Sequence, residues 1–262
     1  MKNALCMIRA EPHYRREAFI GGLRAAGFRL IEKGMAADPE DFLIIWNRYG
    51  SSGSMADAWE KNGGTVIVAE NGYLGKDAAG HQLYALSIHG HNGSGIWPGG
   101  GPERFAALNI ELQPWVKREG YSLICGQRGI GTPHMASPPD WHKLAQTRLQ
   151  KQGNPTQLRL HPGNHMPAIP LETDLAGARD CVIWSSSSGV KALTLGIPVR
   201  FDAPFWICAN AASRLDAPLL YDDEKRLHAM RQMAWAQWSI AELDKGEPFM
   251  RFLEIARAGG AK

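Results

Sequence analysis

The sequence predicts an α/β protein of two lobes, and three observations support this fold class. Short apolar runs alternate with segments of helical periodicity along most of the chain, which is typical of parallel sheets covered by helices. The glycine-rich segment His89–Pro102 interrupts this alternation, which resumes near Tyr121. The chain has 262 residues, and domains commonly have about 100–200 residues. We therefore expect one lobe over residues 1–115 and a second over residues 116–262.

In the first lobe, strands are expected where apolar residues cluster and helices where they recur at helical spacing. The expected strands are Ala4–Ile8, Phe28–Glu32, Asp41–Trp46, Thr65–Ala69 and Gln82–His89, and the expected helices are His13–Ala26, Met55–Lys61 and a short one from Glu103. The run Asp41–Trp46 is apolar on both faces, which predicts a central strand.

The second lobe repeats the pattern. Its expected strands are Tyr121–Cys125, Gln157–Leu160, Cys181–Trp184 and Pro198–Phe201, and its expected helices are Pro138–Gln152, Asp174–Ala178, Val190–Leu195 and Asp222–Ile240. The segment His89–Pro102, near the end of the first lobe, has too many glycines for regular structure. It is a linker or a ligand-binding loop, and His89, His91 and Trp97 favour the loop.

Composition narrows the class of protein only modestly. The net charge of +3 and pI of 8.7 are compatible with anionic ligands but too weak to argue nucleic-acid binding. Basic groups such as Arg226 and Arg231 are interpreted as solvated helix faces. No apolar run is long enough to span a bilayer and no secretory leader is recognised. We therefore expect a cytoplasmic protein with four reduced cysteines, no metal and no tightly bound cofactor.

The strongest local motif is the segment CVIWSSSSGVKAL, which begins at Cys181. A buried strand leads into Ser186, Ser187, Ser188 and Gly189 and then into a helix that carries Lys191. Hydroxyls and free amide groups at a helix start suit a phosphate. The alternative is a helix cap, because serine is a favoured capping residue, but four consecutive serines exceed that need.

Two more segments of the second lobe follow expected strands. His161-Pro162 ends one strand, and Gln127-Arg128 follows another within a glycine-containing loop. Ligands bind open α/β sheets at the carboxyl ends of strands, where a histidine can hydrogen-bond a phosphate and an arginine can clamp a diphosphate. A surface turn is the alternative for His161.

The first lobe offers candidate residues for a second substrate. Asn47, Arg48, Tyr49 and Ser51 follow the central strand, and Glu70 follows the next. With Trp97, the first group is expected to bind an acceptor, and Glu70 and His91 are the expected catalytic bases for a hydroxyl group, with His89 as a rival. Glu70 could instead only stabilise a turn.

The segment WSSSSGVKALTLGIPV resembles the nucleotide-sugar-binding segment of capsule polysaccharide transferases of the Kdo-transferring type. Ser186, Ser187, Ser188, Gly189, Lys191, Gly196 and Pro198 stand in that pattern, with His161-Pro162 upstream. The resemblance covers Gln157 to Asn210 and implies a GT-B glycosyltransferase, in which two Rossmann-like lobes enclose a central cleft. The family more often has glutamate at the position that Lys191 occupies here.

A compact, mildly basic protein of two lobes also resembles the phage enzymes that glycosylate hydroxymethylated pyrimidines in DNA. This likeness is a fold-level analogy. We expect a transferase that uses a nucleotide sugar as its donor. A UDP-sugar is the favoured donor, and modified DNA is the favoured acceptor. A capsule or surface glycan is the alternative acceptor. A sugar-nucleotide epimerase or hydrolase, and a non-catalytic nucleotide- or nucleic-acid-binding protein, are the alternatives from other classes.

Overall fold

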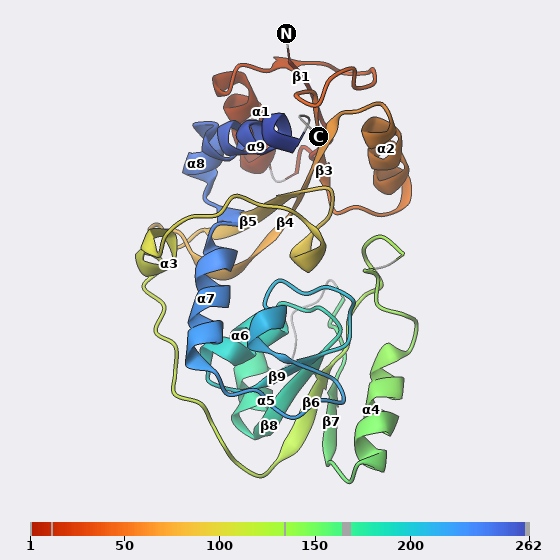
Figure 1. Ribbon diagram of the computed structural model, residues 1–262, viewed down its shortest axis with the longest axis vertical. Helices are drawn as coiled ribbons and strands as arrows, with labels where there is room; N and C mark the ends of the chain where they lie inside the picture. Colours follow the sequence, from red (N-terminus) through yellow and green to blue (C-terminus); the bar gives the residue numbers. More distant parts are fainter. Residues whose placement is uncertain (1, 12, 134, 164–168, 260–262) are drawn as a thin grey trace. The chain divides into compact units, whose positions relative to one another are not determined.

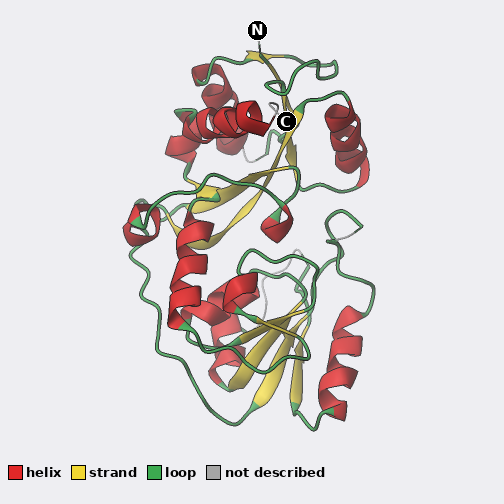
Figure 2. Cartoon of the chain, in the orientation of Figure 1, coloured by secondary structure: helices red, strands yellow, loops and turns green. Residues whose placement is uncertain are grey.

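The computed structural model describes residues 2–11, 13–133, 135–163 and 169–259 (Figure 1). Its strands form two separate sheets, and helices accompany each sheet, so the α/β class is confirmed (Figure 2). The chain divides into two compact units. Unit 1 contains Met1–Leu108 and Gln232–Lys262, and unit 2 contains Asn109–Arg231.

The sheet of unit 1 has the strand order β11-β5-β4-β3-β1-β2. The strands are β1 (Asn3–Cys6), β2 (Arg29–Leu30), β3 (Phe42–Trp46), β4 (Thr65–Lys76), β5 (Gln82–Ile88) and β11 (Gln237–Trp238). Strands β1 to β4 are parallel neighbours, whereas β5 pairs antiparallel with both β4 and β11. The expectation of a parallel sheet was therefore wrong for this edge of unit 1.

A hairpin turn causes the difference. Strand β4 continues to Lys76, well beyond the predicted end at Ala69, and the chain reverses at Asp77. The Asp77 carboxylate accepts hydrogen bonds from the backbone N–H groups of Ala79 and His81. This side-chain turn lets β5 return beside β4 without a crossover helix.

Helices cover both faces of this sheet. On one face α1 (His13–Ala25), α8 (Ile240–Asp244) and α9 (Glu247–Gly259) contribute Phe19, Leu243 and Phe252 to a buried cluster. On the other face α2 (Gly50–Lys61) buries Trp59, whose indole N–H donates to the Asp41 carbonyl at 3.1 Å. Four of the five residues of β3 are buried, as expected for a central strand.

The C-terminal segment departs most from the sequence prediction. The helix expected over Asp222–Ile240 ends earlier, as α7 (Asp223–Ala234), and is followed by β11, α8 and α9. The buried Gln237 side chain accepts from the N–H groups of Tyr73 and Leu74, which fixes β11 at the sheet edge. A capping box between Ser239 and Glu242 then begins α8. Residues 232–262 thus belong to unit 1, although the boundary at residue 115 placed them in the second lobe.

The close contact between α1 and α8 yields a stability prediction. A Cβ at Gly22 would lie 1.8 Å from the Leu243 carbonyl oxygen, whereas a Cβ at Gly53 in α2 would meet nothing closer than 3.8 Å. Gly22→Ala is expected to lower the free energy of unfolding by about 1–3 kcal/mol through overpacking. Gly53→Ala should leave it unchanged or raise it by up to about 1 kcal/mol, because alanine favours helix. Urea denaturation of both variants measures this difference, and equal effects would contradict it.

Unit 2 has a fully parallel sheet with the order β10-β9-β8-β6-β7. Its strands are β6 (Tyr121–Cys125), β7 (Thr156–Arg159), β8 (Ala178–Ile183), β9 (Val199–Phe201) and β10 (Ser213–Arg214), and its helices include α4 (Trp141–Lys151), α5 (Leu171–Ala176) and α6 (Ser188–Thr194). Each predicted strand of this unit is present within a few residues of its expected bounds.

Candidate functional site

The segments predicted to bind an anion meet at one edge of the unit 2 sheet. Strands β7, β6 and β8 are adjacent and parallel, so their carboxyl ends lie side by side. Gln127 follows β6, His161 follows β7, and Ser186 follows β8. Open α/β sheets bind ligands at this edge. The three segments are far apart in the sequence, and the fold brings them together.

Gln127 joins two of these segments. Its side-chain oxygen accepts from the Ser185 backbone N–H at 3.0 Å, and its amide nitrogen donates to the Ser185 hydroxyl at 3.0 Å. Ser185 is buried and Gln127 is half-buried. The side chain therefore fixes the spacing between the loops that follow β6 and β8.

The serine segment forms a tight polar turn before α6. Both the backbone N–H and the hydroxyl of Ser188 donate to the Ser186 hydroxyl oxygen, at 3.2 and 2.9 Å. Ser187 occupies the N-cap position, yet its side chain makes no capping hydrogen bond and is exposed. The helix-cap alternative therefore does not account for the Ser187 hydroxyl.

Gly189 and Lys191 have other partners. A Cβ at Gly189 would lie 2.6 Å from the Ile183 side chain and 2.8 Å from the Trp206 ring, so packing of α6 against the sheet already requires a glycine there. The Lys191 ammonium pairs with Glu172 at 3.0 Å, and both side chains are about half exposed. An exposed pair of this kind is weak, so a competing anion can displace it.

His161 and Arg128 are close enough to interact electrostatically. The His161 Nδ1 accepts from the Gly163 backbone N–H at 2.9 Å, which requires an unprotonated Nδ1. Partial burial and the positive charge of Arg128 both lower the pKa of His161 from its usual value, which favours the neutral ring.

A bound diphosphate should reverse this effect. Its negative charge offsets that of Arg128, so the pKa of His161 is expected to rise on binding, and binding should take up protons between the two pKa values. NMR titration of the His161 ring with and without a nucleoside diphosphate measures the shift. An unchanged or lowered pKa in the complex would exclude His161 from contact with the phosphates.

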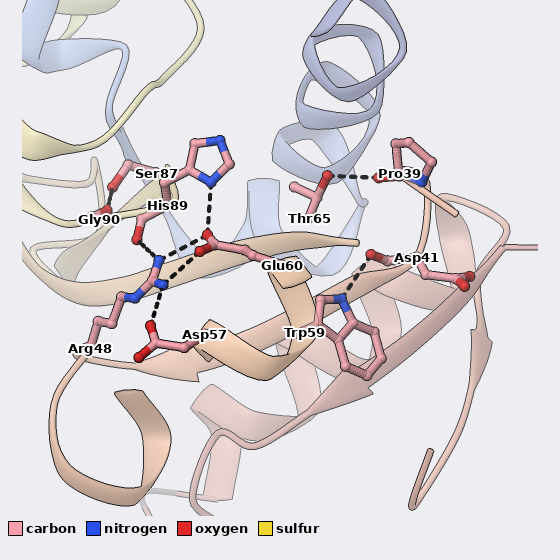
Figure 3. Close-up of polar contacts among 10 residues, drawn as sticks. All are labelled: Pro39, Asp41, Arg48, Asp57, Trp59, Glu60, Thr65, Ser87, His89 and Gly90. Carbon is pink, nitrogen blue, oxygen red and sulfur yellow. Dashed lines mark hydrogen bonds and ion pairs between the residues drawn. The ribbon is translucent and has the colours of Figure 1, made fainter. Parts of the chain in front are cut away.

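In unit 1, the buried Arg48 side chain lies at the centre of an ionic network whose other members are partly exposed (Figure 3). Its guanidinium donates to Glu60 at 2.6 and 2.8 Å, to Asp57 at 2.7 Å and to the His89 carbonyl. The His89 ring faces Glu60, with Nδ1 2.7 Å from the carboxylate. Burial alone would raise the pKa of Glu60. The hydrogen bonds with His89 and Arg48 outweigh this effect and lower the pKa from its usual value, which favours the ionised carboxylate.

This network indicates that Arg48 stabilises the local fold. The guanidinium is 9 % exposed and it holds the turn at His89, where the backbone has a φ of +70°. Asp57 and Glu60 are partners that the sequence analysis missed. Their spacing of three on α2, which places both on one helix face, was the available signal.

The two residues predicted to be catalytic lie on β4 and in the segment that follows β5. Glu70 accepts hydrogen bonds from the Tyr73 hydroxyl and, at 3.0 Å, from the Asn92 backbone N–H. His91 is buried, and its Nδ1 has no hydrogen-bond partner among the described residues. Glu70 lies within β4, and not after the strand as was expected from the sequence. Its hydrogen bond with Asn92 joins β4 to the segment that carries His91, and Tyr73 is a contact that the sequence analysis missed.

The remaining residues predicted for the acceptor, all in unit 1, differ in how exposed their side chains are. Tyr49 is 50 % exposed, immediately before α2, and Ser51 is exposed in its first turn. Asn47 adopts a left-handed conformation with a φ of +57°. Trp97 is partly buried against the cluster that contains Phe19. Of these, Tyr49 and Ser51 are the side chains open to a ligand.

Neither a membrane-spanning helix nor a metal-binding cluster of His, Cys, Asp and Glu occurs in the described ranges of the chain.

Comparison with known proteins gives a fold relationship. Neither a protein-family model nor a curated protein matches the sequence. The chain is similar to the solved structure of Thermosulfurimonas dismutans KpsC, beta Kdo 2,7 transferase, with a TM-score of 0.55 and 12% identity over 97% of this chain and 99% of that one. It is also similar to Thermosulfurimonas dismutans KpsC, beta Kdo 2,4 transferase, with a TM-score of 0.53 and 14% identity over 87% and 89% of the two chains. At these identities the likeness establishes a common fold.

Proposed function

We propose that this protein is a glycosyltransferase that moves a sugar from a nucleotide-activated donor to a hydroxyl group of a capsular or other surface glycan. One observation carries the proposal: the fold likeness to two Kdo transferases covers nearly the whole chain. The polar loops after β6, β7 and β8 support it independently. They include Gln127 and Ser185, which are joined by two hydrogen bonds.

In this proposal unit 2 binds the donor. Arg128, His161 and the hydroxyls of Ser186 to Ser188 contact the phosphates, while Lys191 is released from its exposed pair with Glu172. These groups stabilise the negative charge that develops on the departing nucleotide. Glu70 or His91 of unit 1 accepts the proton of the acceptor hydroxyl.

A glycan is the better supported acceptor. Both similar proteins are Kdo transferases by name, and no described feature of this chain favours DNA. Modified DNA, the acceptor favoured from the sequence, therefore becomes an alternative that the experiment must exclude.

A transfer assay tests the proposal. The full chain is incubated with nucleotide-activated Kdo or with UDP-sugars, and with either a Kdo-containing glycan or hydroxymethylated DNA. We expect nucleotide release that depends on the glycan, with a matching increase in glycan mass. Release without acceptor would identify a hydrolase or epimerase, and sugar on DNA alone would identify the other acceptor. No release with any donor would refute a transferase.

The serine turn makes a separate prediction. Ser187→Ala combined with Ser188→Ala is expected to weaken donor binding by roughly 3–10-fold, the loss of one or two hydrogen bonds, while the melting temperature stays within a few degrees. Calorimetric titration with the donor measures the affinity. Unchanged affinity would mean that these serines serve only the turn before α6.

A further inference from the structure

Unit 2 contains a polar pocket that involves none of the residues assigned to the donor. The pocket has a volume of about 640 Å³ and is lined by Asn210, Glu224, Lys225, Leu227, His228 and Arg231. Asn210 lies in a short 3₁₀ helix (Ala209–Ala211), and the other five residues lie on α7. The sequence alone indicated only a solvated helix face at Arg226 to Arg231.

Three side chains with nitrogen donors are arranged on one helix face. Lys225, His228 and Arg231 are separated by three positions each, so they are neighbours along α7, and all three are exposed. The opposite face is buried through Ala229, Met230 and Met233. Helix α7 thus presents a positive stripe to the pocket while its apolar face anchors it to the protein.

Most of the hydrogen-bonding side chains that line the pocket have few partners within the protein. Arg226, one position after Lys225, is buried and donates to the Gln113 carbonyl at 2.9 Å and to Asp223 at 2.6 Å. In contrast, the side chains of Asn210, His228 and Arg231 have no hydrogen-bond or ion-pair partner among the described residues. Lys225 has only a 3.4 Å pair with Asp222.

We propose that this pocket binds the carboxylate or phosphate group of a small anionic ligand. Arg231 supplies the planar fork of N–H groups that matches either oxyanion. Lys225 and His228 add donors, and the Asn210 amide can contact a neighbouring hydroxyl or oxyanion. Glu224 is the pocket's one carboxylate, and it disfavours ligands that bring a charge to its side. The proposal does not depend on transfer activity.

NMR titration of the full chain tests it with two probes at constant ionic strength: inorganic pyrophosphate as the phosphate source and galacturonate as the sugar carboxylate. We expect saturable shifts of the side-chain signals of Asn210, His228 and Arg231, while the ring signals of His81, in unit 1, stay unchanged. Shifts with one probe only would identify which anion the pocket takes. No saturable shift with either probe would overturn the proposal.

Three substitutions separate a built site from general electrostatic attraction. Arg231→Gln should weaken binding by about 10-fold, the loss of a charge-assisted hydrogen bond, and Glu224→Gln should strengthen it by about 2-fold. Lys151→Gln, which removes the same charge from the exposed end of α4, should change it by less than about 2-fold. Equal weakening in Arg231→Gln and Lys151→Gln would overturn the proposal. The backbone NMR spectrum of each variant establishes that it is folded.

Discussion

Replacing Asp180 with alanine is expected to lower the free energy of unfolding by about 3–5 kcal/mol, because it leaves buried positive charge without its partner. Asp180 is fully buried in β8. Its carboxylate accepts from the Ser122 hydroxyl at 2.7 Å and pairs with Arg179 and Arg200 at 3.2 and 3.3 Å. The side chain of Arg200 is only 10 % exposed, so water cannot replace the lost carboxylate.

Asp216 provides the matched control. It pairs with Arg148, but the two side chains are 52 % and 43 % exposed, so Asp216→Ala should change the free energy of unfolding by less than about 1 kcal/mol. Guanidinium denaturation of the two variants at one pH measures the difference. A loss below about 1 kcal/mol for Asp180→Ala would mean that the arginines find other partners.

Gln127→Ala is expected to weaken nucleotide-donor binding by about 10-fold, the effect of one to two hydrogen bonds. The side-chain oxygen and nitrogen of Gln127 hydrogen-bond the backbone N–H and the hydroxyl of Ser185, and each of these two hydrogen bonds would be lost. The loops after β6 and β8 then lose their fixed spacing, and groups on the two loops no longer meet the same phosphates. The position acts through Ser185, so binding should fall even if Gln127 does not touch the ligand.

Gln146 on α4 is the control for this variant. Its amide nitrogen donates to the Thr156 hydroxyl at 3.2 Å, at the amino end of β7 and away from the loops. Gln146→Ala should leave donor affinity unchanged. Calorimetric titration of both variants with one donor measures the contrast, and full affinity in Gln127→Ala would show that Ser185 holds its position without the amide.

The parallel sheet of unit 2 was predictable because apolar residues cluster in β6 (YSLIC) and at the end of β8 (CVI), and a polar turn follows each of these runs. The run Tyr121–Cys125 became β6 over the same residues. Parallel order also places successive strand ends at one edge, so candidate residues could be grouped before any coordinates were known. The pairing of Gln127 with Ser185 was not predictable, because it depends on β6 and β8 being neighbours.

Unit 1 was harder to predict because its edge is built from distant segments. The amphipathic pattern continues past Ala234, so nothing local marks where α7 ends. The structure places Trp238 in a strand because β5 offers a free edge and Gln237 bonds the backbone of Leu74. Arg48 is similar: its loop position suggested a ligand contact, whereas three acceptors from α2 and the His89 turn surround it.

The central claim is that the carboxyl ends of β6, β7 and β8 bind the nucleotide of an activated sugar. The most direct test is an NMR shift map of the full chain titrated with a nucleotide sugar. We predict saturable shifts centred on Gln127, His161 and Ser186 to Ser188. Saturable shifts confined to other residues, with these loops unchanged, would contradict the claim.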